Sequence, residues 1–175
     1  MIGEFNRRSG SLFTEKNQLF SKNGSHRLEW LVNKTPRSSH WVFPGGNVTI
    51  NLFEAASYCF VNGQFLGAIV MGLSYIEHTL VGLFTAAGRQ ELENADVELL
   101  AREAMSLGLL KQRDFDIIKE ATKKRDAKFV MRRTIGLQND EKLIIDENEE
   151  DSTVYEEDSR KIMSVVIQLL DKKML

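Results

Sequence analysis

The chain has little of what metal centres and redox sites require. Cys59 is the single cysteine among 175 residues, so an internal disulfide, a thiolate metal cluster and a Cys-x-x-Cys redox pair are excluded. The three histidines, His26, His40 and His78, are dispersed, and no His-x-x-x-His or Glu-x-x-His pair presents two metal ligands on one helical face. Glycine motifs for phosphate or dinucleotide binding are missing as well. We therefore expect neither a metal nor a cofactor.

Sequence features of export and of membrane insertion are also missing. Residues 1–10 contain no apolar core of the kind found in a secretory signal, so a cytoplasmic location is expected. The most apolar stretch, residues 65–84, carries Glu77 and His78 in its second half, where a membrane span needs uncharged residues. We predict a buried helix of a soluble protein here, and no membrane partner.

Proline is confined to the beginning of the chain. Both prolines lie in the first 44 residues, and their absence from the rest is expected of helix interiors. The sequence therefore predicts two parts. Residues 1–45 form an irregular, basic, aromatic-containing extension, in which residues 27–32 and 40–43 are either short strands or extended chain. Residues 46–175 form a helical bundle.

Apolar periodicity predicts the helices of this bundle. Residues 64–87 repeat apolar side chains at the spacing of one helical face, and Gly88 follows as a terminating glycine. Gly67, Gly72 and Gly82 inside this helix each cost about 1 kcal/mol relative to alanine, which indicates that neighbouring segments approach closely there. The other expected helices are residues 47–62, capped by Asn47 or Thr49; residues 96–107, capped by Asp96 and ended by Gly108; residues 112–133; and residues 159–175. The predicted fold class is all-α, a bundle of about five helices with an irregular N-terminal extension.

Charge is segregated along the chain although the net charge is only −2. Residues 139–158 contain ten acidic residues and one basic residue, which predicts a solvated acidic loop. Residues 119–133 contain seven basic residues against two acidic ones, which predicts a basic helix. Such a helix either contacts phosphates or is an ordinary solvated face.

Glu77 and His78 are the polar residues of an otherwise apolar helix. One interpretation is that one of them faces solvent while the other is a hydrogen-bonded core group. The alternative pairs Glu77 with Arg125, which continues the apolar stripe of residues 112–133 and therefore turns towards the apolar side of its helix. An arginine in that position is either part of an internal ion pair or an anion-binding group.

The helix order, together with the run Arg125-Asp126-Ala127-Lys128-Phe129-Val130-Met131-Arg132, resembles the HEPN superfamily of small all-α proteins over about residues 47–173. The resemblance implies a homodimer and metal-independent RNA cleavage. In this family an arginine stabilises charge on the scissile phosphate, and a histidine about five residues further on handles the proton of the attacking 2′-hydroxyl. Val130 stands at the histidine position here, and no Arg-x(4–6)-His occurs in the chain. Valine transfers no proton, so we expect no catalytic residues.

Two readings remain open, and a third is kept as the enzyme alternative. In the first, a non-catalytic HEPN-like dimer binds RNA, a nucleotide or a cognate protein, which by resemblance places it in a toxin–antitoxin or defence context. In the second, the chain is a protein-interaction or scaffold module whose basic helix pairs with the acidic segment within one chain or across a dimer. In the third, His78 supports weak ribonuclease activity. The candidate anion-binding residues are Arg125, Asp126, Glu77 and His78, and the candidate basic patch comprises Lys124, Lys128, Arg132 and Arg133.

Overall fold

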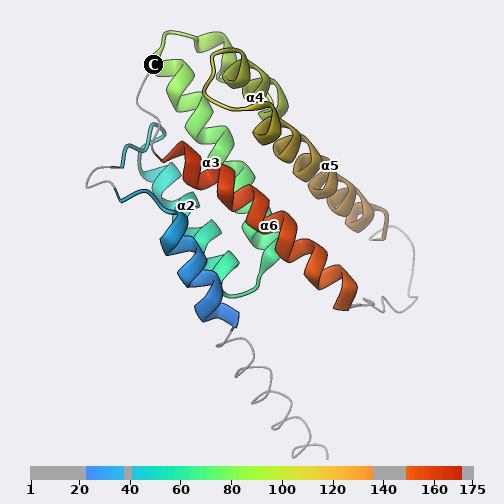
Figure 1. Ribbon diagram of the computed structural model, residues 1–175. Coiled ribbons are helices and arrows are strands. Elements are labelled where there is room, and N and C mark those ends of the chain that lie inside the picture. The colour runs from blue at the N-terminus through green and yellow to red at the C-terminus, as the bar shows by residue number, and fades with distance from the viewer. Residues whose placement is uncertain (1–22, 38–40, 136–148, 171–175) are drawn as a thin grey trace, which may run out of the picture.

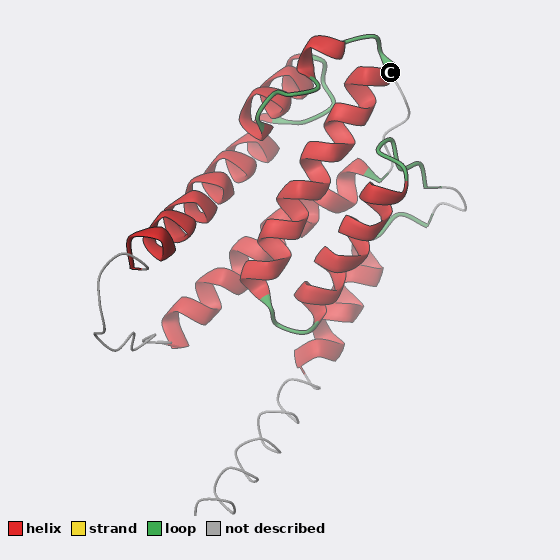
Figure 2. Ribbon diagram, turned by 180° about the vertical axis from the view of Figure 1, so that it is seen from behind, coloured by secondary structure: helices red, strands yellow, loops and turns green. Residues whose placement is uncertain are grey.

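A computed structural model describes residues 23–37, 41–135 and 149–170, with residues 127–135 and 149–152 described by their helical backbone alone. The described chain contains helices and turns but no strand, so the predicted all-α class is confirmed (Figures 1 and 2). A first helix covers residues 23–34. It is followed by α2 (Asn47–Val61), α3 (Phe65–Ala86), a short 3₁₀ turn (Gln90–Leu92), α4 (Val97–Ser106), α5 (Gln112–Ile135) and α6 (Glu149–Leu169).

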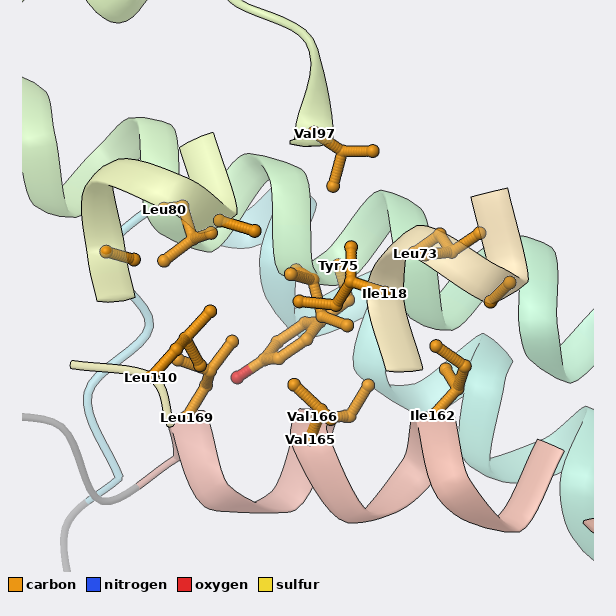
Figure 3. Close-up of a cluster of buried hydrophobic side chains, with 14 of the residues drawn as sticks. Leu73, Tyr75, Leu80, Val97, Leu110, Ile118, Ile162, Val165, Val166 and Leu169 are labelled. Atoms are coloured by element: carbon orange, nitrogen blue, oxygen red, sulfur yellow. The ribbon is translucent and has the colours of Figure 1, made fainter. Parts of the chain in front are cut away.

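Helix α3 lies at the centre of the bundle and packs against α2, α4, α5 and α6 (Figure 1). By length and composition alone it could cross a membrane. Ten of its residues are instead buried by neighbouring helices, including Leu73, Ile76 and Leu80. Figure 3 shows part of this core, where residues of α3, α5 and α6 meet. Each fully buried leucine or isoleucine contributes roughly 1.5–3 kcal/mol to folding.

The glycines of α3 are the points of closest approach, as predicted. A Cβ atom on Gly72 would lie 2.5 Å from Cγ2 of Ile162 in α6. A Cβ atom on Gly82 would lie 2.6 Å from the carbonyl carbon of Pro44, and one on Gly67 would lie 3.1 Å from Sγ of Cys59 in α2. The missing side chains therefore let α6, α2 and the chain before α2 pack directly against α3.

The helix ends match the sequence signals at three positions and differ at one. Gly88 and Gly108 follow α3 and α4 with φ values of 80° and 74°, the left-handed conformation that glycine adopts without strain. Asp96 caps α4 through its carboxylate, which accepts a hydrogen bond of 2.8 Å from the amide of Leu99. The prediction of Asn47 or Thr49 as the cap of α2 is wrong, because the N-cap residue is Gly46 with φ 65° and no side chain caps this end.

Replacing Asp96 with alanine is expected to lower the free energy of unfolding by about 1 kcal/mol, since the amide of Leu99 loses its capping acceptor. Urea denaturation followed by far-UV circular dichroism measures this loss. Asp96→Asn is the matched control, because the amide oxygen of asparagine still accepts the hydrogen bond. An alanine variant as stable as the asparagine variant would contradict the assignment of the cap.

Two segments differ from the predicted organisation. Residues 23–34 are helical, so the expectation of strands or extended chain at residues 27–32 is wrong. Residues 41–43, the described part of the second expected strand, form no regular element. Helix α6 begins at Glu149, so the second half of the predicted acidic loop at 139–158 is helical; the first half lies outside the described residues.

The helix at residues 23–34 is held by Arg27, which is 4% exposed. Its Nε donates a hydrogen bond of 3.0 Å to the carbonyl oxygen of Val61, and its guanidinium lies 5.4 Å from the ring centroid of Phe65 and 3.8 Å from the carboxylate of Glu156. Burial lowers the pKa of Arg27, and the nearby Glu156 opposes this effect. One arginine thus ties this helix to the α2–α3 corner and to α6.

Candidate functional site

The four predicted anion-binding residues form two separate pairs rather than one cluster. On α3, Nδ1 of His78 lies 3.0 Å from the carbonyl oxygen of Ser74, one turn earlier in the same helix. The ring of His78 therefore contacts the backbone of its own helix. Glu77 is half-buried and makes no hydrogen bond or ion pair with any described residue. The alternative interpretation, an ion pair between Glu77 and Arg125, is not found among the described contacts, where the carboxylate that contacts Arg125 belongs to Asp126.

Arg125 and Asp126 form the second pair, near the middle of α5. The Nε of Arg125 donates a hydrogen bond of 2.9 Å to Oδ1 of Asp126. The side chain of Arg125 is 25% exposed and that of Asp126 is 59% exposed, so the contact is open to water. Asp126 engages the Nε of the guanidinium, and the two terminal NH₂ groups of Arg125 make no hydrogen bond to a described residue. These groups are the donors with which arginine binds phosphate oxygens.

The basic patch predicted around Arg125 is partly neutralised within the chain. The Nζ of Lys124 lies 2.5 Å from Oδ2 of Asp158 in α6 and 2.9 Å from Oε1 of Glu120. The hydrogen bond to Asp158 raises the pKa of Lys124, and Glu120 adds to this rise. Lys123, in contrast, is exposed and has no ion pair with a described residue.

The remaining members of the predicted patch lie on the last turns of α5, within the helix Gln112–Ile135. Their side chains are outside the described part of the structure, as is that of Val130, so their contacts stay predictions. The helical backbone places them on one continuous element with Arg125. These residues are Lys128, Arg132 and Arg133.

A groove that the sequence analysis did not identify lies along α6. We call it the α6 groove; its volume is about 950 Å³. Helix α6 passes between the helix at 23–34 and α5 (Figure 1) and supplies the floor, with residues spaced as one helical face. Those floor residues are Glu157, Arg160, Lys161, Ser164, Ile167 and Gln168; the walls are Trp30, Lys34 and Pro36 on one side and Lys111, Arg113, Asp114 and Ile117 on the other.

The α6 groove has an excess of positive charge. Lys34, Lys111 and Arg113 are exposed, and their side chains have no acidic partner among the described residues. Of the two acidic residues in the lining, Asp114 accepts hydrogen bonds from the amide of Lys111 at 2.9 Å and from Nε2 of Gln168 at 3.1 Å. The other, Glu157, pairs with Lys161 at 2.9 Å and therefore leaves the three free cations uncompensated.

Sequence reasoning missed the α6 groove because its cations come from two segments about 75 residues apart in the chain. Lys34 is the last residue of the helix at 23–34, which the sequence did not predict, whereas Lys111 and Arg113 flank the start of α5. None of these residues belongs to a local run of basic residues. Lys34 could have been placed near α6 only if the helix at 23–34 had been predicted.

Among the described residues, no three His, Cys, Asp or Glu side chains come close enough together to hold a metal ion. His78 is engaged within α3 and has no contact with Arg125. Comparison of the chain with protein-family models, curated proteins and solved structures found no match. The chain is a small all-α protein without an assigned family.

Proposed function

We propose that the chain is a non-catalytic, HEPN-like binding module of the cytoplasm that holds a phosphate-bearing ligand, RNA or a nucleotide, along the second half of α5. One observation carries the proposal. Arg125 is partly buried and is oriented by Asp126, while its terminal NH₂ groups have no described partner. A guanidinium held in this way loses little side-chain entropy when it binds a phosphate. The resemblance to the HEPN superfamily also leads us to expect a homodimer.

The surroundings of Arg125 support this proposal. Lys123 on the same helix is exposed and has no ion pair with a described residue, and α5 continues as one helix to Ile135. Its last turns carry three more basic residues in sequence. Several cations on one helix neutralise neighbouring phosphates along a strand, and this neutralisation supplies most of the sequence-independent affinity for nucleic acid.

We expect the full chain to bind a short labelled single-stranded RNA with an affinity that falls steeply between ~50 and ~200 mM salt. The double variant Lys123→Ala/Arg125→Ala should weaken binding about tenfold or more and reduce the salt slope by about one for each lost phosphate contact. Fluorescence anisotropy measures both quantities. Arg102→Ala is the control, because Arg102 is 58% exposed, belongs to α4 and already pairs with Glu98. Equal binding by the double variant and the control would reject the proposal.

A second candidate function, a protein-interaction or scaffold module, is favoured by the contact between Lys124 and Asp158. It joins the basic helix to the acidic segment within one chain, as that reading expects. Under this alternative, wild-type protein shows no salt-dependent RNA binding, while Lys124→Ala weakens the packing of α5 against α6. The RNA experiment therefore separates the two functions. We do not propose the ribonuclease alternative, since the imidazole on which it depends, that of His78, contacts the carbonyl oxygen of Ser74 within its own helix.

A further inference from the structure

We propose that the α6 groove is a docking site for an acidic amphipathic helix of a partner protein. This site is separate from the surface around Arg125, and the proposal does not depend on the function assigned there. Three features of the groove carry it: the arrangement of apolar and charged residues, the charge balance and the length of the floor.

The α6 groove combines buried or half-buried apolar residues with exposed cations. Ile167 on the floor is 4% exposed, and Trp30 and Ile117 on the two walls are half-buried. Lys34 and Arg113 are exposed on opposite walls, whereas the floor cations Arg160 and Lys161 already pair with Glu156 and Glu157. Apolar residues beside exposed charges are typical of a protein interface, and a helix that lies in a groove buries its apolar side chains against such residues.

The charge balance selects an acidic partner. Lys34, Lys111 and Arg113 have no acidic partner in the described chain, whereas Asp114 and Glu157 are already engaged. A partner with carboxylates on both flanks of its apolar stripe would compensate the three cations from both walls. A basic partner would be repelled by them, and like charges facing each other across an interface cost several kcal/mol.

The dimensions of the floor fit a helix of about three turns. The floor residues extend from Glu157 to Gln168 on one face of α6, which corresponds to about 16 Å at 1.5 Å per residue. The helix at 23–34 and α5 flank this face (Figure 1), so a third helix would lie against α6 between them. The expected occupant is therefore a helix of about twelve residues, one face of which contacts the groove.

The aromatic content of the groove argues against a nucleic acid strand as its occupant. Trp30 is the aromatic residue of the lining, and its ring already has two partners. The guanidinium of Arg160 lies 5.1 Å from its ring centroid, and the ring of Phe60 lies 5.3 Å away. Single-stranded nucleic acids gain much of their affinity from bases that stack on free aromatic faces, and the groove offers little such surface.

The test is a titration of the ¹⁵N-labelled full chain with a synthetic acidic helix, followed by NMR. The probe carries a leucine seam flanked by glutamates, and the control peptide has lysine at each glutamate position. We expect the acidic peptide to shift the indole N–H signal of Trp30, which lines the groove, and not that of Trp41, which does not. The lysine peptide should shift neither signal.

Charge reversal in the chain completes the test. Lys34→Glu/Arg113→Glu should weaken binding of the acidic peptide about tenfold or more, and both side chains are exposed, so circular dichroism should confirm an intact fold. Lys123→Glu is the matched control, since Lys123 is equally exposed but lies outside the groove; it should leave peptide binding unchanged.

Three results would overturn the proposal. The first is an acidic peptide that shifts no groove signals or binds the double variant as well as wild type. The second is a stronger response of Trp30 to inorganic tripolyphosphate or single-stranded RNA than to the peptide, which would make the groove a phosphate site. The third is self-association, measured by light scattering, that Lys34→Glu/Arg113→Glu abolishes, which would make a second copy the occupant.

Discussion

Replacing Gly82 with alanine is expected to lower the free energy of unfolding by about 2 kcal/mol, although alanine is the better helix former. A Cβ atom at this position would lie 2.6 Å and 2.7 Å from the carbonyl carbon and oxygen of Pro44, and 2.9 Å from the amide nitrogen of Gly45. These neighbours are backbone atoms, so the segment before α2 must move as a whole. Overpacking of this kind costs up to about 3 kcal/mol, and the gain in helix propensity returns about 1 kcal/mol.

Gly67 provides the matched control on the same helix. A Cβ atom there would lie 3.1 Å from Sγ of Cys59, a side-chain atom that can turn away. Gly67→Ala should therefore leave stability unchanged or raise it by up to about 1 kcal/mol. Urea denaturation of the two variants beside wild type gives the comparison. If Gly82→Ala proved as stable as Gly67→Ala, the close packing of α3 against Pro44 would be refuted.

The helices of the bundle were predictable wherever local signals and burial agree. Residues 64–87 repeat apolar residues over six turns, and the structure has α3 over almost the same range, with Gly88 at its end. The cap at Asp96 has a local mechanism and was found for the same reason. The cap of α2 was missed because the left-handed Gly46 ends the preceding turn there, which a choice among polar residues cannot anticipate.

The helix at 23–34 and the first turns of α6 were missed because contacts far apart in sequence stabilise them. Polar residues dominate both segments, and the helix at 23–34 depends on the burial of Arg27 against Val61. The acidic start of α6 suggests a solvated loop when read alone. In the structure, Arg160 and Lys161 pair with the glutamates one turn before them, and Lys124 of α5 approaches Asp158.

The candidate site was predictable in its residue types but not in its pairings. Periodicity placed Arg125 on the half-buried side of α5, and the structure agrees. One of the two interpretations paired Arg125 with Glu77 of the apolar helix, whereas in the structure the carboxylate of the adjacent Asp126 accepts a hydrogen bond of 2.9 Å from Arg125. The apolar periodicity of α5 indicates which way the side chain of Arg125 faces. The identity of its ion-pair partner depends on how one helix is shifted along another. The sequence pattern contains no information on that shift.

Replacing Tyr75 with phenylalanine is expected to stabilise the protein at pH 11 by about 1.4 kcal/mol more than it does at pH 7. Tyr75 is fully buried on α3, and its hydroxyl points towards Leu110 and Leu169 (Figure 3). This hydroxyl has no hydrogen bond of acceptable geometry in the described chain. Burial raises the pKa of Tyr75 to about 12, an effect that the nearby hydroxyl of Thr79 opposes.

The folded state binds the phenolic proton of Tyr75 more tightly than the unfolded state does. Because the pKa of the folded state exceeds the usual value near 10, the unfolded chain releases this proton first as the pH rises. The contribution of Tyr75 to the free energy of unfolding of wild type is therefore constant below about pH 10. It falls by about 1.4 kcal/mol per pH unit between about pH 10 and pH 12. Phenylalanine has no proton to release, so the difference between variant and wild type should grow over this window.

Urea titrations of wild type and Tyr75→Phe at pH 7, 10 and 11 measure this effect. At pH 7 the variant should match or exceed wild type by about 1 kcal/mol, since it removes a buried hydroxyl without a partner. Tyr58→Phe controls for the loss of a phenol at the surface, where Tyr58 is 65% exposed. A difference between Tyr75→Phe and wild type that stays constant from pH 7 to pH 11 would show that the phenol reaches water. The packing of α3 against α6 around Leu169 would then be looser than the core requires.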